Sequence, residues 1–200
     1  MRPLGAPEMN TATDERRDGA AGEQAPQGRC RRSNHAPPVC QCVPVASIWN
    51  RSAMSFRFPD RWTTSCADLL TGLNTHNVEY LLIGSMAKAL HSVNGTTVDD
   101  MDVMVDATPD NARKVTLLFH KLGLQTDAAT TERLAKRGQQ VPLFEGSADV
   151  LTPPHGVFDF AEAAARRMEV LIPRIDIPIK LAALCDLDAL DALREAAEKP

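Results

Sequence analysis

The chain has 200 residues, a formal net charge of −4 at pH 7 and a hydrophobic content of 44%. This length favours one domain with a sizeable core, and no apolar run is long enough to cross a membrane. Residues 1–53 carry seven Arg against five acidic residues, so the remainder has a net charge of −6. An acidic domain lacks the basic surface of a general nucleic-acid-binding protein, so an RNA end as substrate is allowed but not favoured.

The first 60 residues contain clusters of Pro, Gly, Arg and Ala without a periodic apolar pattern. They are predicted to be a disordered tail, followed by a folded domain at 61–200. No apolar signal-peptide core follows Arg2, and Met54 precedes the first convincing element. We therefore hypothesise that the tail is an upstream extension of the native start, which the intact mass of the native protein would test.

The five cysteines do not form a metal-binding pattern. Cys30, Cys40 and Cys42 with His35 lack the paired CxxC spacing of a zinc site. An odd number of cysteines spread over tail and domain indicates reduced thiols and a cytoplasmic location.

The first predicted elements are a helix at 66–73, a strand at 80–83 and a helix at 85–91. Gly84 lies between the strand and the second helix, where a residue without a side chain lets the backbone approach a ligand closely. Together with Ser85 it is predicted to hold phosphate groups. Lys88, one turn later, is either a further phosphate contact or an ordinary solvated lysine.

A short strand at 101–105 carries the strongest chemical signal. Alternate residues of a strand share a face, so Asp100 and Asp102 lie on one side. Two carboxylates this close repel each other unless a cation joins them, and oxygen ligands suit Mg²⁺ or Mn²⁺. Asp99 and Asp106 are interpreted as solvated turn residues.

Further along the chain, Thr108 caps a predicted helix at 109–122, and another helix is predicted at 131–137. Residues 139–144 and 148–151 are predicted to form a hairpin. Asp149 lies inside the second of these strands. An acid within an apolar strand is unusual unless it faces a metal or a partner.

The last third of the chain is predicted to contain a helix at 158–167, a strand at 169–172 and one long helix at 179–198. The fold class is therefore α/β in the sense of α+β: a mixed sheet flanked by helices, with a C-terminal helix.

Two segments, Ile83-Gly84-Ser85 and Asp100-Met101-Asp102-Val103, resemble the motif of the DNA polymerase β-like nucleotidyltransferase superfamily. The layout of residues 65–190 looks most like the small bacterial nucleotidyltransferases related to abortive-infection AbiE toxins. The resemblance implies a minimal nucleotidyltransferase fold, which moves a nucleoside monophosphate from a nucleoside triphosphate, such as ATP, to an acceptor hydroxyl. It also implies a role in toxin–antitoxin or phage-defence systems, with a cognate partner protein.

The resemblance also implies a third carboxylate from a later strand. Asp149 is the first candidate and Asp176 the second, because a proline follows Asp176 closely. With two metal ions bridging Asp100 and Asp102 to the triphosphate, Asp149 would help to deprotonate the acceptor. Lys180 lies where some relatives place a triphosphate-contacting residue, although its neighbours also fit a plain amphipathic helix.

Two classes of function stay open. The favoured class is a metal-dependent nucleotidyltransferase whose acceptor is RNA, a protein or a small molecule. The other is a protein that keeps the fold without catalysis and uses its acidic, helical surface to bind a partner.

Overall fold

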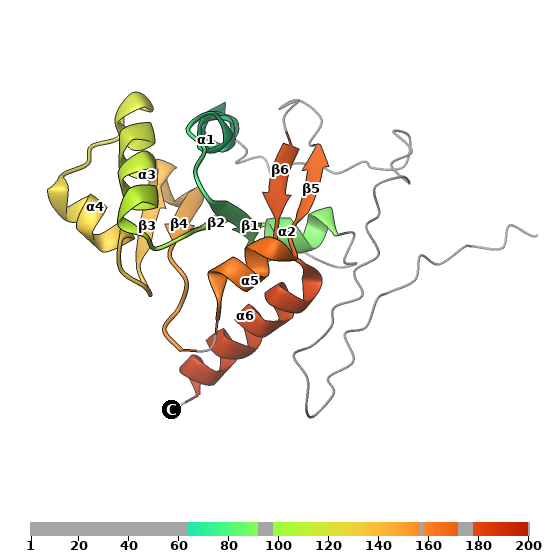
Figure 1. Ribbon diagram of the computed structural model, residues 1–200. Coiled ribbons are helices and arrows are strands. Elements are labelled where there is room, and N and C mark those ends of the chain that lie inside the picture. Colours follow the sequence, from blue (N-terminus) through green and yellow to red (C-terminus); the bar gives the residue numbers. More distant parts are fainter. Residues whose placement is uncertain (1–63, 92–97, 157, 172–177, 200) are drawn as a thin grey trace, which may run out of the picture.

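The computed structural model describes residues 64–91, 98–156, 158–171 and 178–199. Several predictions concern residues outside these ranges: the disordered tail, the start at Met54, the three cysteines and the histidine of the tail, and Asp176. Within the described ranges the chain forms the expected α+β fold, a six-stranded mixed sheet with helices on both sides (Figure 1).

The strand order in the sheet is β3-β4-β2-β1-β6-β5. The central strand β1 pairs antiparallel with β2 and parallel with β6, and β2 pairs parallel with β4. Antiparallel pairs β3–β4 and β5–β6 form the two edges. The strands are β1 Tyr80–Ile83, β2 Met101–Val105, β3 Gln140–Leu143, β4 Ala148–Leu151, β5 Met168–Leu171 and β6 Pro178–Leu181.

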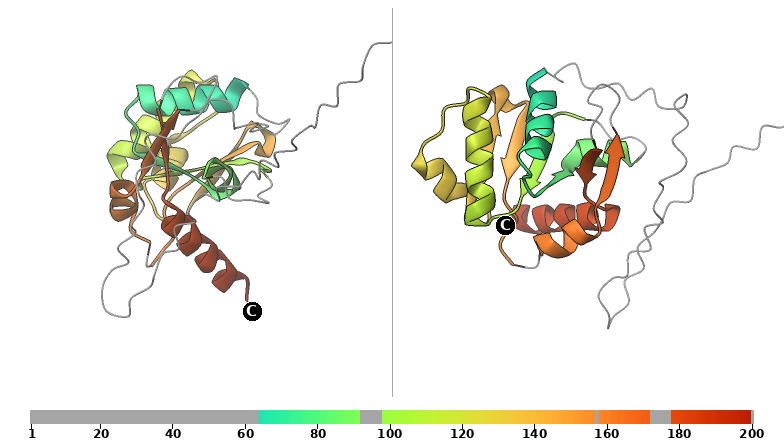
Figure 2. Two further views of the ribbon diagram at one scale, coloured as in Figure 1. Left: turned by 90° about the vertical axis from the view of Figure 1, so that its right-hand side faces the viewer. Right: turned by 45° about the horizontal axis from the view of Figure 1, so that its top comes forward.

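Helices cover the sheet from opposite sides, with α1 and α3 on one side and α5 and α6 on the other (Figures 1 and 2). No helix among the described residues is long and apolar enough to cross a membrane. The helices are α1 Thr64–Thr75, α2 Gly84–Leu90, α3 Pro109–Lys121, α4 Ala128–Leu134, α5 Phe160–Ala165 and α6 Leu184–Glu198, with a short 3₁₀ turn at Phe144–Gly146.

The side of the sheet under α1 and α3 holds much of the core. Every second residue of β2 points to this side, and the apolar stripes of the helices pack against these side chains. This burial aligns β2 with its neighbours, since a slip by one residue would move its apolar side chains to the other face. The fully buried members include Leu69, Leu70, Leu73, Val103, Val105, Val115 and Phe119.

The buried side chain of Asn111 joins α3 to the strand ends. Its Nδ2 donates to the backbone oxygens of Glu79, at 2.9 Å, and Asp106, at 3.0 Å. Its Oδ1 accepts from the Glu79 amide at 2.8 Å. Asn111 therefore links the start of β1 to the end of β2, which supports the register on which the site depends.

The predicted single helix at 179–198 is wrong at its start. Residues Pro178–Leu181 form strand β6, and α6 begins at Leu184. Ile179 and Leu181 are buried while Lys180 between them is partly exposed, which is the alternation of a strand. Pairing with β1 decides the outcome, because it satisfies backbone groups that a helix would otherwise bond internally.

The remaining predicted elements are present, with ends that shift by a few residues. The largest shift at a helix start is at α4, which begins at Ala128 rather than at 131. The Asp127 carboxylate accepts from the Thr130 amide at 2.8 Å and completes a capping box. A polar cap thus extends the helix beyond what its apolar spacing indicated.

Candidate metal centre

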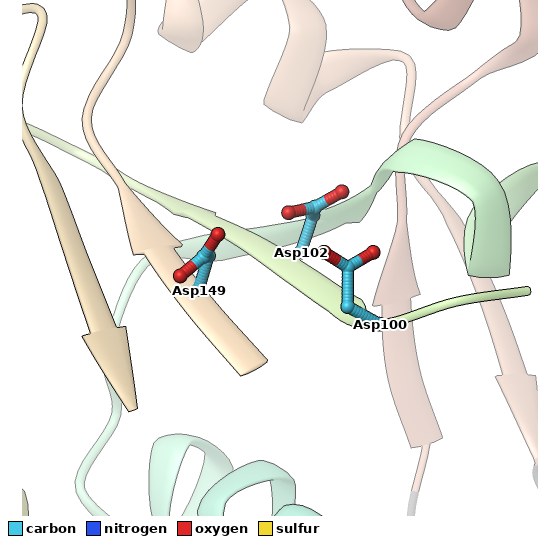
Figure 3. Close-up of side chains that lie close together, drawn as sticks. All are labelled: Asp100, Asp102 and Asp149. Atoms are coloured by element: carbon cyan, nitrogen blue, oxygen red, sulfur yellow. The ribbon is translucent and has the colours of Figure 1, made fainter. Parts of the chain in front are cut away.

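Asp100, Asp102 and Asp149 converge at the end of the sheet where strands β2 and β4 begin (Figure 3). Asp102 and Asp149 are direct partners in the parallel β2–β4 register, so their side chains share a face. One carboxylate oxygen from each of the three residues lies within 4.8 Å of the others. The structure therefore brings together the three acids that the sequence singled out.

The apolar residues beside these acids explain why the carboxylates share one side. Met101 and Val103 flank Asp102 and are buried, as are Ala148 and Val150 on either side of Asp149. Because successive strand residues alternate between faces, burial of these four side chains sends both carboxylates to the opposite face. The hydrophobic core thus holds the acids in place despite their like charge.

Burial and like charge both favour the protonated forms of Asp102 and Asp100. The pKa of Asp102 is raised to about 6, first by burial and then by the charges of Asp100 and Asp149. The pKa of Asp100 is also raised, first by burial and then by Asp149 and Asp99. A bound cation would remove this penalty, since it favours the ionised carboxylates.

Gly84 contacts this cluster from the end of β1. Its φ of +70° is unfavourable for residues with a side chain, and a Cβ placed on it would lie 2.1 Å from Asp102 Oδ2. The β1–β2 register explains the closeness, since Ile83 is the direct partner of Asp102. Glycine is therefore required here by backbone conformation and by space.

Ser85 follows Gly84 in the first turn of α2. Its Oγ is buried and has no hydrogen-bond partner among the described residues. A buried hydroxyl without a partner loses its hydration without compensation. Ser85 is the next residue after Gly84, so this unpaired donor lies in the segment that was predicted to hold phosphate.

The two lysines predicted to bind phosphate make other contacts. Lys88 forms an ion pair with Asp191 of α6. Lys180 Nζ lies 3.1 Å from the Val78 oxygen and 3.4 Å from Glu79 Oε2. Val78 and Glu79 precede β1, whereas Gly84 follows it, so Lys180 is directed toward the other end of that strand.

Two residues near the cluster were missed in the sequence. Gln140 of β3 donates from Nε2 to Asp149 Oδ2 at 2.7 Å. Arg194 of α6 lowers the pKa of both Asp100 and Asp102 by its charge, although its own ion-pair partner is Glu198 at 3.0 Å. No local pattern marks either residue, because each reaches the cluster only through the packing of separate elements.

Comparison with known proteins gives no match: no family model, no curated protein and no solved structure is significantly similar to this chain. Functional inference therefore depends on the geometry and chemistry of the acidic cluster.

Proposed function

We propose that the protein is a metal-dependent nucleotidyltransferase, which transfers a nucleoside monophosphate from a nucleoside triphosphate to an acceptor hydroxyl. The observation that carries this proposal is the convergence of Asp100, Asp102 and Asp149 within 4.8 Å. Three carboxylate ligands from two neighbouring strands suit the hard cations Mg²⁺ and Mn²⁺.

The surroundings of the carboxylates support a bound cation and a phosphate group. The raised pKa of Asp102 reflects a charge that the protein leaves largely uncompensated. The backbone at Gly84 comes close to the same carboxylate, with no side chain in between. Ser85 Oγ is an unpaired donor in the adjacent position, and a phosphate oxygen would accept from it.

Metal ions held by the three acids would stabilise the charge on the attacking and leaving oxygens. Asp100 and Asp102 would hold metal ions beside the triphosphate, and Ser85 would donate to a phosphate oxygen. Asp149 would accept the proton of the acceptor hydroxyl. The acceptor oxygen then forms a bond to the α-phosphorus, the bond from that phosphorus to the bridging oxygen breaks, and pyrophosphate leaves with the electron pair.

The resemblance to DNA polymerase β-like nucleotidyltransferases leads us to propose a role in toxin–antitoxin or phage-defence systems. The acceptor is RNA, a protein or a small molecule. We place this activity in the cytoplasm, where an odd number of cysteines is compatible with reduced thiols.

The test is transfer of radioactive label from each of the four α-labelled nucleoside triphosphates, with Mg²⁺ or Mn²⁺, to candidate acceptors. We expect transfer with the native chain and none with Asp100→Asn or Asp102→Asn. Asp68→Asn is the matched control, because Asp68 is exposed on α1, on the far side of the sheet. Full transfer by Asp100→Asn would overturn the proposal.

A second candidate is a protein that retains this fold and binds a partner without catalysis. The observation that favours it is the engagement of Lys88 and Lys180 in other ion pairs, which leaves neither free to neutralise a triphosphate. Under this proposal the purified chain binds its partner protein equally well with and without nucleotide and metal. Binding that requires both would contradict it.

A further inference from the structure

We propose that Gln140 is a positioning residue of the metal centre: its side-chain amide orients the Asp149 carboxylate for cation binding. This inference rests on the proposed function, because it assumes that the acidic cluster holds a metal ion. It assigns a role to a residue on an edge strand that belongs to none of the sequence motifs.

The contact between the two side chains is direct. Gln140 Nε2 lies 2.7 Å from Asp149 Oδ2, at the short end of the usual range for an N–H···O hydrogen bond. An ionised carboxylate can only accept, so the nitrogen of the amide, not its oxygen, must face Asp149. The contact is therefore a charge-assisted hydrogen bond with a defined direction.

The strand register explains why Gln140 reaches Asp149. In the antiparallel β3–β4 pair, Gln140 is opposite Leu151 and Pro142 is opposite Asp149. Gln140 and Asp149 are thus diagonal neighbours on the same face, a separation that a long side chain can span. Pro142, directly opposite Asp149, has a ring that cannot donate a hydrogen bond.

The backbone around Gln140 is held in place from two sides. Arg133 of α4 donates from Nη2 to the backbone oxygen of Gln140 at 2.8 Å. The backbone N–H of the preceding residue, Gln139, donates to Thr152 Oγ1 at 2.8 Å, and the backbone oxygen of Gln139 accepts from the Thr152 N–H at 2.9 Å. The side chain of Gln140 is exposed, and it extends from a strand start whose backbone is held on both sides.

Glutamine suits this role because it is a neutral donor. A Lys or Arg at the same position would neutralise Asp149 and compete with the cation. The glutamine amide adds no charge, and by donating to Oδ2 it leaves Oδ1 of Asp149 for the metal. Carboxylate ligands in metal sites are commonly oriented by such hydrogen bonds, and losing one typically weakens metal binding about 10- to 100-fold.

The experiment measures Mn²⁺ binding to the full-length chain by electron paramagnetic resonance of free Mn²⁺, without nucleotide. Gln140→Met keeps the side-chain length and removes the donor, and we expect its Kd to rise about 10-fold. Gln125→Met is the control, since Gln125 is exposed in the α3–α4 connection. Gln140→Asn keeps the amide on a shorter chain and should bind with intermediate affinity. Thermal midpoints equal to that of the native chain show that each variant is folded.

The outcomes separate this inference from the proposed function. If the native chain binds Mn²⁺ and Gln140→Met binds it equally well, Gln140 is not a positioning residue, while the metal centre stands. If the native chain binds no Mn²⁺ in the millimolar range, the metal centre itself fails, and this inference fails with it. Weaker binding by Gln140→Met with unchanged binding by Gln125→Met supports the inference.

Discussion

The buried acid Asp186 and the partly buried cluster of Asp100, Asp102 and Asp149 differ in whether a cationic side chain pairs with them. Asp186 of α6 is 5% exposed and is paired with Arg166, which follows α5. Arg166 Nη2 lies 2.6 Å from Asp186 Oδ1, and Nε lies 3.3 Å from Oδ2. In contrast, no Lys or Arg in the described part of the chain forms an ion pair with Asp100, Asp102 or Asp149.

The difference separates an acid that is neutralised within the fold from acids that have no cationic partner among the described residues. Asp186 is compensated within the fold by a two-pronged guanidinium contact, which also raises the pKa of Arg166. Asp100 and Asp102 are compensated only weakly, by the charge of the exposed Arg194, and burial raises the pKa of Asp102 to about 6. A fold that pairs one acid so well leaves three others together at the sheet edge, which is the behaviour expected of a cation site.

The largest expected effect is on catalysis. Asp102→Asn removes one of the three proposed metal ligands, and under the proposed function we expect at least an approximately 1,000-fold loss of transfer, because a metal ion contributes several kcal/mol to transition-state stabilisation. Initial rates with labelled nucleoside triphosphate measure this loss. Equal rates for Asp102→Asn and Asp68→Asn would show that the acidic cluster is not needed for transfer.

The paired acid should respond in the opposite way, through stability. Arg166→Met leaves Asp186 buried without its cation, and we expect the free energy of unfolding to fall by about 2–3 kcal/mol. Urea denaturation measures the change, and Arg113→Met is the control because that exposed arginine pairs with exposed Asp110. If both variants have the same stability, the Arg166–Asp186 pair is no more structural than a surface pair.

Gly84 and Gly123 form a matched pair of glycines with φ of +70° and +73°. Gly123→Ala meets open space and should cost only the backbone strain of about 1 kcal/mol. Gly84→Ala adds the clash with Asp102, so we expect a loss of about 2 kcal/mol or more, accompanied by weaker Mn²⁺ binding. Denaturation and Mn²⁺ titration measure both effects. Equal losses in the two variants would show that Gly84 does not constrain the acids.

The pH dependence of stability should reveal the uncompensated charge. The pKa of Asp102 is 3.8 in its ordinary state and about 6 in the fold, so the folded state holds the proton more tightly between these values. Stability from this group is therefore present at low pH and is lost as pH rises through about 6. In metal-free buffer, Asp102→Asn should be more stable than the native chain by about 1–2 kcal/mol at pH 7, after allowance for solvent screening.

The difference between Asp102→Asn and the native chain should disappear below pH 3.8, where Asp102 is protonated in both the folded and the unfolded chain. Urea denaturation across this pH range measures it. A stability difference that does not change with pH would mean that the Asp102 carboxyl has an ordinary pKa.

Arg194 should have the smallest effect, because its side chain is 82% exposed. Arg194→Ala removes the charge that lowers the pKa of Asp102, so that pKa should rise further. Solvent screens exposed charges strongly, so we expect the Mn²⁺ affinity to change by less than about 5-fold. Carboxyl NMR titration of Asp102 measures the shift. An unchanged or lower pKa would show that Arg194 does not act on the cluster.

Much of the fold can be predicted from local sequence patterns, and the errors of that prediction have identifiable causes. The apolar alternation of β2 and the Thr108 cap of α3 are visible in the sequence, and both elements form where expected. Residues 179–181 are predicted to belong to a helix because the apolar run continues into the Ala- and Leu-rich α6, but they lie in strand β6. Short apolar runs do not distinguish a strand from a helix, and pairing with β1 decided this one.

The amino-acid sequence is enough to predict that Asp100 and Asp102 share a face, because side-chain direction alternates along any strand. It also indicated a glycine at the bend that follows β1, since few other residues tolerate such a backbone. In contrast, the parallel pairing of β4 with β2 is visible only in the folded protein, and this pairing sets Asp149 opposite Asp102, with Gln140 within hydrogen-bonding distance of Asp149. Strand order depends on how all the apolar faces are buried at once, so no single segment encodes it.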